Sequence, residues 1–175
     1  VPVVVNERGD RRRVQALAPG QVPPRILVVD DIDDNRAVLC GLLGAVGFDV
    51  REAADGDAAL RLWRDWQPRL IWLDKRMPDM DGIEVARRIR AEEQRLGRDR
   101  VVILALSASA LEHQRAEILA SGADDFLPKP FREGMIFAKM AEYLDLNYVY
   151  EMPGDRGNEP AMPASAIDPV QWSRL

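Results

Sequence analysis

The chain has 175 residues, 47% of them hydrophobic, which is enough for one domain of ordinary size with flanking segments and too little for two. Its formal net charge is −5 with both signs interspersed, so the composition gives no nucleic-acid footprint. The single cysteine, Cys40, allows no internal disulfide and no cysteine-based metal cluster. The sequence contains no long apolar span and no signal peptide, so we expect a cytoplasmic chain without direct membrane contact.

The first 24 residues are expected to be an extension outside the main domain. Residues 1–18 can be read as a β-hairpin with its turn at 7–10, followed by a Pro-rich linker at 19–24. At the other end, residues 148–175 read as a linker followed by the start of a truncated helix at 168–175. The main domain is therefore predicted at residues 25–147.

Within that domain, short apolar strands alternate with amphipathic helical segments. This alternation predicts parallel β-α-β units with right-handed crossovers. We expect strands at residues 26–29, 48–52, 70–73, 101–106 and 125–128. Helices are expected from 33 or 34 to 46, from 55–56 to just before Pro68, and at 82–96, 110–120 and 131–144.

The first and fourth helices carry the most specific expectations. Asp33 or Asp34 suits the N-cap of the first helix, and Gly47 should end it. The periodicity predicts these buried positions: Val38, Leu39, Leu42, Leu43 and Val46 in the first helix, and Leu111, Ile118 and Leu119 in the fourth.

Polar residues follow four of the five strands directly. Asp30 and Asp31 follow the first strand, Asp74 the third, Ser107 the fourth, and Lys129 the fifth. In parallel α/β sheets, ligands bind beyond the carboxyl ends of the strands, so these side chains are expected to share one edge. Asp74 is the central candidate, because a buried strand delivers it to a loop rich in Pro and Gly.

This set, in this order, resembles the receiver domain of two-component response regulators. The resemblance rests on the acidic pair, on Asp74 followed by the Met-Pro-Asp-Met-Asp-Gly run at 77–82, on Ser107 followed by Ala, and on Lys129-Pro130. It implies a flavodoxin-like (βα)5 fold, a doubly wound parallel sheet with strand order 2-1-3-4-5. In that order the first and third strands are neighbours, so their carboxylates converge.

The resemblance also implies residue roles. Asp74 would be the phosphoacceptor, and Mg²⁺ would be held by Asp30, Asp31, Asp74 and the backbone carbonyl of Arg76. Lys129 and the Ser107 hydroxyl would contact the phosphoryl oxygens, and Ser107 and Phe126 would form the switch. A cis peptide bond is expected between Lys129 and Pro130.

By the same resemblance, the chain takes a phosphoryl group from a phosphohistidine and changes conformation. Its partners would be a histidine kinase, in cis or in trans, and a histidine phosphotransfer domain, with no nucleic acid. A second copy could bind the face of the fourth helix, fifth strand and fifth helix. The flanks look like those of receiver modules in hybrid sensor histidine kinases. Whether the fragment counts as an enzyme stays open, since it would assist only its own phosphorylation and dephosphorylation.

Two alternatives remain at this stage. One is a degenerate receiver that binds partners without being phosphorylated. The other is a phosphatase with an Asp nucleophile, whose motif residues 31–35 match only in part. A calcium loop starting at Asp31 is rejected, because Arg36 replaces the required Gly and Leu42 the terminal Glu. The sequence does not specify the signal, the cognate kinase, the phosphoryl lifetime, the oligomeric state or the full domain architecture.

Overall fold

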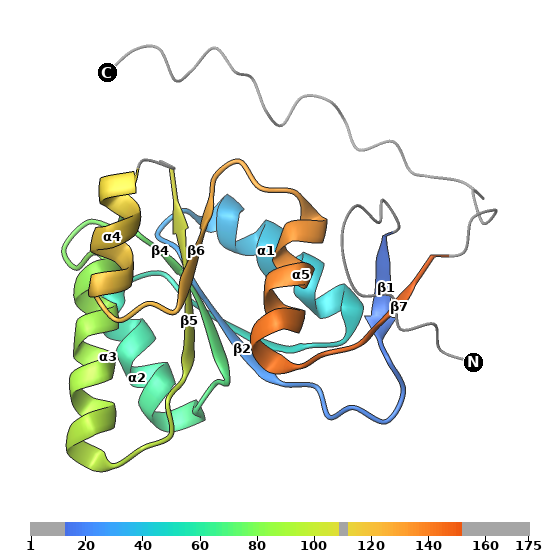
Figure 1. The fold of residues 1–175 in the computed structure, drawn as a ribbon, viewed down its shortest axis with the longest axis horizontal. Helices are drawn as coiled ribbons and strands as arrows, with labels where there is room; N and C mark the ends of the chain where they lie inside the picture. The colour runs from blue at the N-terminus through green and yellow to red at the C-terminus, as the bar shows by residue number, and fades with distance from the viewer. Residues whose placement is uncertain (1–12, 109–111, 152–175) are drawn as a thin grey trace, which may run out of the picture.

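The computed structural model describes residues 13–108 and 112–151, without the side chains of 112–114. A five-stranded parallel sheet in the order β3-β2-β4-β5-β6 forms its centre, which confirms the predicted flavodoxin-like order 2-1-3-4-5 (Figure 1). The strands of this sheet are β2 (Arg25–Val29), β3 (Asp49–Ala53), β4 (Leu70–Asp74), β5 (Val102–Ser107) and β6 (Asp125–Pro128). The helices are α1 (Asp33–Val46), α2 (Gly56–Trp66), α3 (Gly82–Leu96), α4 (Glu112–Ala120) and α5 (Glu133–Leu144).

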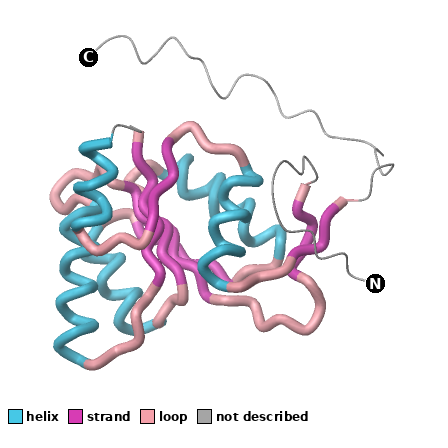
Figure 2. Tube along the Cα trace, viewed as in Figure 1, coloured by secondary structure: helices cyan, strands magenta, loops and turns pink. Residues whose placement is uncertain are grey.

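Helices cover both faces of the sheet, as Figure 2 shows, with α1 and α5 on one face and α2, α3 and α4 on the other. Alternate residues of the central strands enter the two cores. In β4, for example, Ile71 and Leu73 pack with α2 and α3, whereas Leu70 and Trp72 pack with α1 and α5. Burial on both faces explains why this strand is apolar throughout. Among the described residues no helix is long and apolar enough to cross a membrane.

The register brings the strand ends together. Val29 of β2 lies opposite Leu73 of β4, so Asp30 and Asp74 follow in adjacent positions. Farther along the sheet, Ser107 of β5 lies opposite Pro128 of β6, one residue before Lys129. The four strand ends selected from the sequence therefore meet at one edge.

Three expectations for the helices were wrong. The N-cap of α1 is Ile32, with no side-chain cap, because Asp33 and Asp34 lie within the first turn and Asp33 pairs with Arg36. Val38 is 69% exposed. Leu119 is 37% exposed, while Ile118 beside it is buried as expected. The prediction for Leu111 lies outside the described residues. The remaining predicted positions of α1 are buried or partly buried: Leu39, Leu42, Leu43 and Val46.

The segments flanking the main sheet form a second, two-stranded sheet. β1 (Val14–Leu17) pairs antiparallel with β7 (Tyr148–Tyr150). The second strand of the expected hairpin therefore forms. Its partner, however, is the segment that was predicted to begin the C-terminal linker. The first strand of that hairpin and the expected helix at 168–175 lie outside the described residues. Val14 and Tyr148 are buried in the same core as α1 and α5. The described strands of the two flanks, β1 and β7, are thus packed against the main domain.

Candidate functional site

The ammonium group of Lys129 joins the two central carboxylates. Its Nζ lies 2.8 Å from Oδ1 of Asp74 and 3.1 Å from Oδ2 of Asp30. Both carboxylates are almost fully buried, with 6% of Asp74 and 2% of Asp30 exposed. A buried charge is costly unless it is paired, so this cation offsets part of the cost of holding two anions at one strand edge.

Asp30 is further fixed by hydrogen bonds within its own loop. Its Oδ1 accepts from the backbone N–H of Ile32 at 2.9 Å, and the side-chain amide of Asn35 donates to Oδ2 at 3.1 Å. From the other side, Arg36 donates to the backbone carbonyl of Asp30 at 2.7 Å. The carboxylate is therefore held in one orientation before any ligand arrives.

Asp31 completes an acidic cluster. One carboxylate oxygen from each of Asp30, Asp31 and Asp74 can be chosen so that all three lie within 4.8 Å of one another. Asp31 also lines an open hollow of about 560 Å³, together with the loop that follows β4. Arg76 lines the same hollow beside Asp31. Its predicted role, the binding of a metal ion by its backbone carbonyl, stays a prediction. The acidic cluster therefore has an open hollow on the side of Asp31.

Glycine at position 82 allows the loop after β4 to fold closely over Asp74. A Cβ atom at Gly82 would lie 2.3 Å from the backbone oxygen of Asp74, far inside van der Waals contact. The N–H of Gly82 donates to the carbonyl of Lys75 at 3.0 Å, and the Asp81 side chain caps α3 by accepting from the N–H of Glu84. The Asp-Gly pair at 81–82 thus both turns the loop and starts the helix.

Burial and neighbouring charges shift the pKa values of Asp74 and Lys129. Burial raises the pKa of Asp74, and Asp30 and Asp31 act in the same direction, while Lys129 opposes them without cancelling the effect. For Lys129 burial alone would lower the pKa, but the hydrogen bonds and charges of Asp74 and Asp30 outweigh it, and the pKa is raised. The lysine is therefore a permanent cation, and the carboxylates it contacts remain incompletely neutralised.

Ser107 and Phe126 lie on the adjoining strands β5 and β6. Ser107 is buried at the end of β5, where its carbonyl accepts from the N–H of Lys129 at 2.7 Å. The bond between Lys129 and Pro130 is cis, as expected. The ring of Phe126 is partly buried, and the guanidinium of Arg115 lies 5.7 Å from its centroid. The hydroxyl contact of Ser107 and the rotation of Phe126 stay predictions.

Four residues that act around this site were not predicted from the sequence. Asn35 and Arg36 hold the Asp30 loop, Lys75 forms an ion pair with Glu117 of α4 at 2.8 Å, and Arg115 covers Phe126. Asn35 and Arg36 could have been found, since they lie four to six residues after the acidic pair, in the first turn of α1. The contacts made by Lys75 and Arg115 join separate elements, and no local pattern indicates them.

Comparison with known families agrees with this geometry. Residues 26–141 match the family model described as the response regulator receiver domain. The chain belongs to the response regulator receiver family. The matched residues include both aspartates of the acidic pair, Asp74, Ser107 and Lys129, and this membership places the chain in two-component signalling.

Relatives and solved structures give the same result. The response regulator MprA of Mycobacterium sp. (strain KMS) is 40% identical over 123 residues, which cover 70% of this chain and 51% of MprA. Hybrid signal transduction histidine kinase L of Dictyostelium discoideum is 33% identical over 128 residues, 71% of this chain and 8% of the kinase. The receiver domain of Saccharomyces cerevisiae Ssk1, solved with the histidine phosphotransfer protein Ypd1, matches with a TM-score of 0.66 and 30% identity, covering 70% of this chain and 91% of that one. The chain thus spans about half the length of MprA.

Proposed function

We propose that Asp74 accepts a phosphoryl group from a phosphohistidine and that the chain acts as a two-state phosphorylation switch. One observation carries this proposal: a nearly buried carboxylate at a strand end, 2.8 Å from a fixed ammonium group and beside the carboxylates of Asp30 and Asp31. In the reaction, an Asp74 carboxylate oxygen forms a bond to phosphorus while the phosphorus–nitrogen bond of the donor breaks. The imidazole leaves with the electron pair of that bond.

The chain's own residues orient and neutralise the reacting groups. Lys129 would exchange one of its carboxylate contacts for an oxygen of the arriving phosphoryl group, which carries most of the negative charge. Ser107 would donate its hydroxyl to another of those oxygens. Asn35 and Arg36 keep Asp30 in place, so that this carboxylate does not have to be reordered during transfer.

The residues present fit a bound Mg²⁺. Three carboxylates, those of Asp30, Asp31 and Asp74, converge near a single ammonium group, so the site has an excess of negative charge. Oxygen ligands are those that Mg²⁺ prefers. Asp30, Asp31, Asp74 and the carbonyl of Arg76 would hold it. When bound, the ion supplies positive charge that reduces repulsion between the carboxylates and the incoming phosphoryl group.

The partners follow from the donor chemistry. A helical domain bearing a phosphohistidine, either in a histidine kinase or in a phosphotransfer protein, would approach the hollow beside Asp31. The solved complex of Ypd1 with the Ssk1 receiver domain supports this type of partner. The likeness to a Dictyostelium hybrid kinase supports a hybrid kinase as the parent protein. The receiver would lie in the cytoplasm. The face of α4, β6 and α5 would be read by an output partner or by a second copy.

Phosphorylation of the intact chain by acetyl phosphate and Mg²⁺ tests the proposal. Mass spectrometry should show one added phosphoryl group on the parent chain and none on Asp74→Asn. Asp79→Asn is a matched control, since Asp79 is exposed in the same loop and should leave the reaction unchanged. An unmodified parent chain would favour the degenerate adaptor instead, and normal labelling of Asp74→Asn would move the acceptor to another residue.

A further inference from the structure

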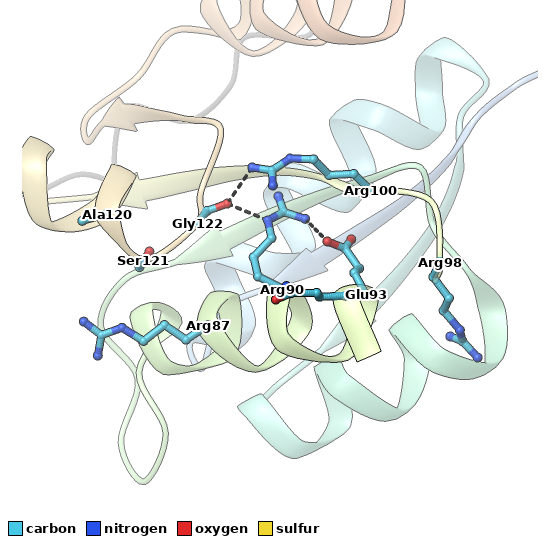
Figure 3. A pocket seen from close by; sticks show the side chains of 9 residues that line it. Arg87, Arg90, Glu93, Arg98, Arg100, Ala120, Ser121 and Gly122 are labelled. Atoms are coloured by element: carbon cyan, nitrogen blue, oxygen red, sulfur yellow. Dashed lines mark hydrogen bonds and ion pairs between the residues drawn. The ribbon is translucent and has the colours of Figure 1, made fainter. Parts of the chain in front are cut away.

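A groove rich in arginine lies at the end of the sheet opposite to Asp74. Its walls are the C-terminal half of α3, the loop between α3 and β5, and the turn between α4 and β6, and its volume is about 560 Å³. This loop and this turn precede β5 and β6, whereas Asp74 follows β4, so the two sites occupy opposite edges. We call it the arginine groove; its lining includes Arg87, Arg90, Glu93, Arg98, Arg100 and Gly122 (Figure 3).

The groove is locally positive in an acidic chain. Residues 87–100 contain six arginines and three acidic residues, whereas the whole chain carries a net charge of −5. Four of the arginines line the groove, against one glutamate of the lining and the neighbouring Asp124. Neither Arg87 nor Arg98 forms an ion pair with any residue in the described part of the chain. The lining of the groove therefore carries more arginines than acidic residues, and Arg98 also interacts electrostatically with Glu92 of α3.

The centre of the groove is rigid. Arg90 donates to the carbonyl of Gly122, to Glu93 and to Asp124, at 2.7–2.8 Å, and Arg100 donates to Gly122 and Asp124. These contacts use three of the five N–H groups of Arg90. Gly122 has a φ of +103°, and a Cβ there would lie 2.5 Å from Cγ of Arg90, so only glycine lets this guanidinium lie across the turn.

The outer arginines give the groove its length. In Figure 3 the side chains of Arg87 and Arg98 point away from the central pair, toward opposite ends. The guanidinium of Arg98 also lies 5.4 Å from the ring centroid of Trp63, which limits its freedom. One small monovalent anion would contact one end only. An elongated ligand with several charges would contact the fixed centre and an outer arginine at the same time.

We propose that the arginine groove binds a ligand through a di- or triphosphate group. Planar guanidinium groups match phosphate oxygens in pairs of hydrogen bonds, and two of the four are held in place before binding. The groove has no aromatic side chain in its lining, so recognition rests on the phosphates and not on a stacked base. The ligand could therefore be an inorganic polyphosphate or a nucleotide that offers the same group.

Titration of the intact chain with inorganic triphosphate tests the proposal. The metal is left out, and the ionic strength is near physiological because screening removes weak surface binding. We expect saturable binding by calorimetry and amide shift changes confined to residues 87–100 and 120–122. Arg87→Gln combined with Arg98→Gln should weaken binding by about tenfold or more. Arg61→Gln combined with Arg95→Gln is the matched control. Both residues are exposed and lie outside the groove, and this pair of substitutions removes the same two positive charges as the pair in the groove.

Further ligands distinguish the source of the phosphates. Equal affinity for ATP and triphosphate would show that the groove reads phosphates alone, and tighter ATP binding would make the ligand a nucleotide. The proposal would be overturned by any of four results. These are no binding of triphosphate, equal losses of affinity in the two double variants, amide shift changes centred on Asp74, or binding of an acidic peptide alone. None of these readouts depends on phosphorylation of Asp74.

Discussion

The guanidinium of Arg115 on α4 lies 5.7 Å from the ring centroid of Phe126 on β6. Arg115 is exposed, so the attraction between cation and ring is worth about 0.5–1 kcal/mol. If Phe126 turns inward on phosphorylation, this contact is lost, and it therefore favours the unphosphorylated state. The contact links the expected switch residue to the helix that is expected to move.

Arg115→Ala should therefore shift the equilibrium toward the activated state. We expect the affinity for beryllofluoride, which mimics the aspartyl phosphate, to rise about two- to fivefold in the presence of Mg²⁺. Fluorine NMR or calorimetry measures it. Arg61→Ala is the control, since it removes an exposed arginine from α2. An unchanged or lower affinity in Arg115→Ala would show that this contact does not restrain the switch.

Gly82→Ala should destabilise the chain by more than about 2 kcal/mol, because the added Cβ would lie 2.3 Å from the backbone oxygen of Asp74. Gly44→Ala provides the opposite control. Gly44 lies inside α1 with no atom within 4 Å of an added Cβ, and alanine there should stabilise the helix by about 0.5–1 kcal/mol. Urea unfolding measures both. Equal effects of the two substitutions would show that the close approach at position 82 is not required.

The predictions from sequence succeeded where one short segment determines the result. Apolar strands that alternate with helices form a parallel sheet, and the polar residues at the strand ends, Asp30, Asp74, Ser107 and Lys129, then lie at a common edge. Pairing of β1 with β7 could not be predicted, since each strand has only three or four residues and their partners are far apart in sequence. Hydrophobic periodicity also places Arg36 on the surface. Arg36 is nevertheless buried, because its guanidinium pairs with the backbone carbonyl of Asp30 and the carboxylate of Asp33.

Mg²⁺ should stabilise the folded chain, because it would bind the carboxylate cluster only when the strands bring it together. At ten times the dissociation constant, the gain in unfolding free energy is about 1.4 kcal/mol, which raises the melting temperature by a few degrees. Asp31→Asn should remove most of this increase. Asp34→Asn, on the exposed side of α1, should retain it. An undiminished increase in Asp31→Asn would exclude this carboxylate from the metal site.

Cys40 should react slowly with alkylating reagents at neutral pH. Burial raises the pKa of its thiol to about 11, with help from the Glu52 carboxylate, which lies 3.6 Å from the sulfur. The thiolate is the reactive form, so the native chain should react about a hundred times more slowly at pH 8 than an unperturbed cysteine.

Alkylation rates with iodoacetamide between pH 7 and 11.5 measure this effect. The rate should still be rising at pH 11, where about half of the thiol is ionised, whereas the chain unfolded in urea should reach half its maximal rate near the ordinary cysteine pKa. Glu52→Gln should move the rate profile of the native chain to lower pH, because it removes the negative charge beside the thiol. A native rate profile with its midpoint near pH 8.5 would contradict the assigned environment.

The β1–β7 sheet should contribute to the stability of the receiver core. Tyr148 packs edge-on against Phe137 at 5.4 Å and donates its hydroxyl to the Phe137 carbonyl at 3.1 Å. Val14 is buried in the same core. A chain shortened to residues 25–147 exposes the surface that both side chains cover, and it should lose about 3–5 kcal/mol of unfolding free energy.

Single substitutions in the full chain separate packing from chain length. Tyr148→Phe removes only the hydrogen bond and should cost about 1 kcal/mol in urea unfolding. Val14→Ala should cost about 1–2 kcal/mol through lost apolar burial. Val22→Ala is the control, since Val22 is 87% exposed and its change should lie within about 0.5 kcal/mol. If the shortened chain were as stable as the full one, the two flanking strands would be accessory to the domain. A clear loss would extend the folded unit beyond residues 25–147 on both sides.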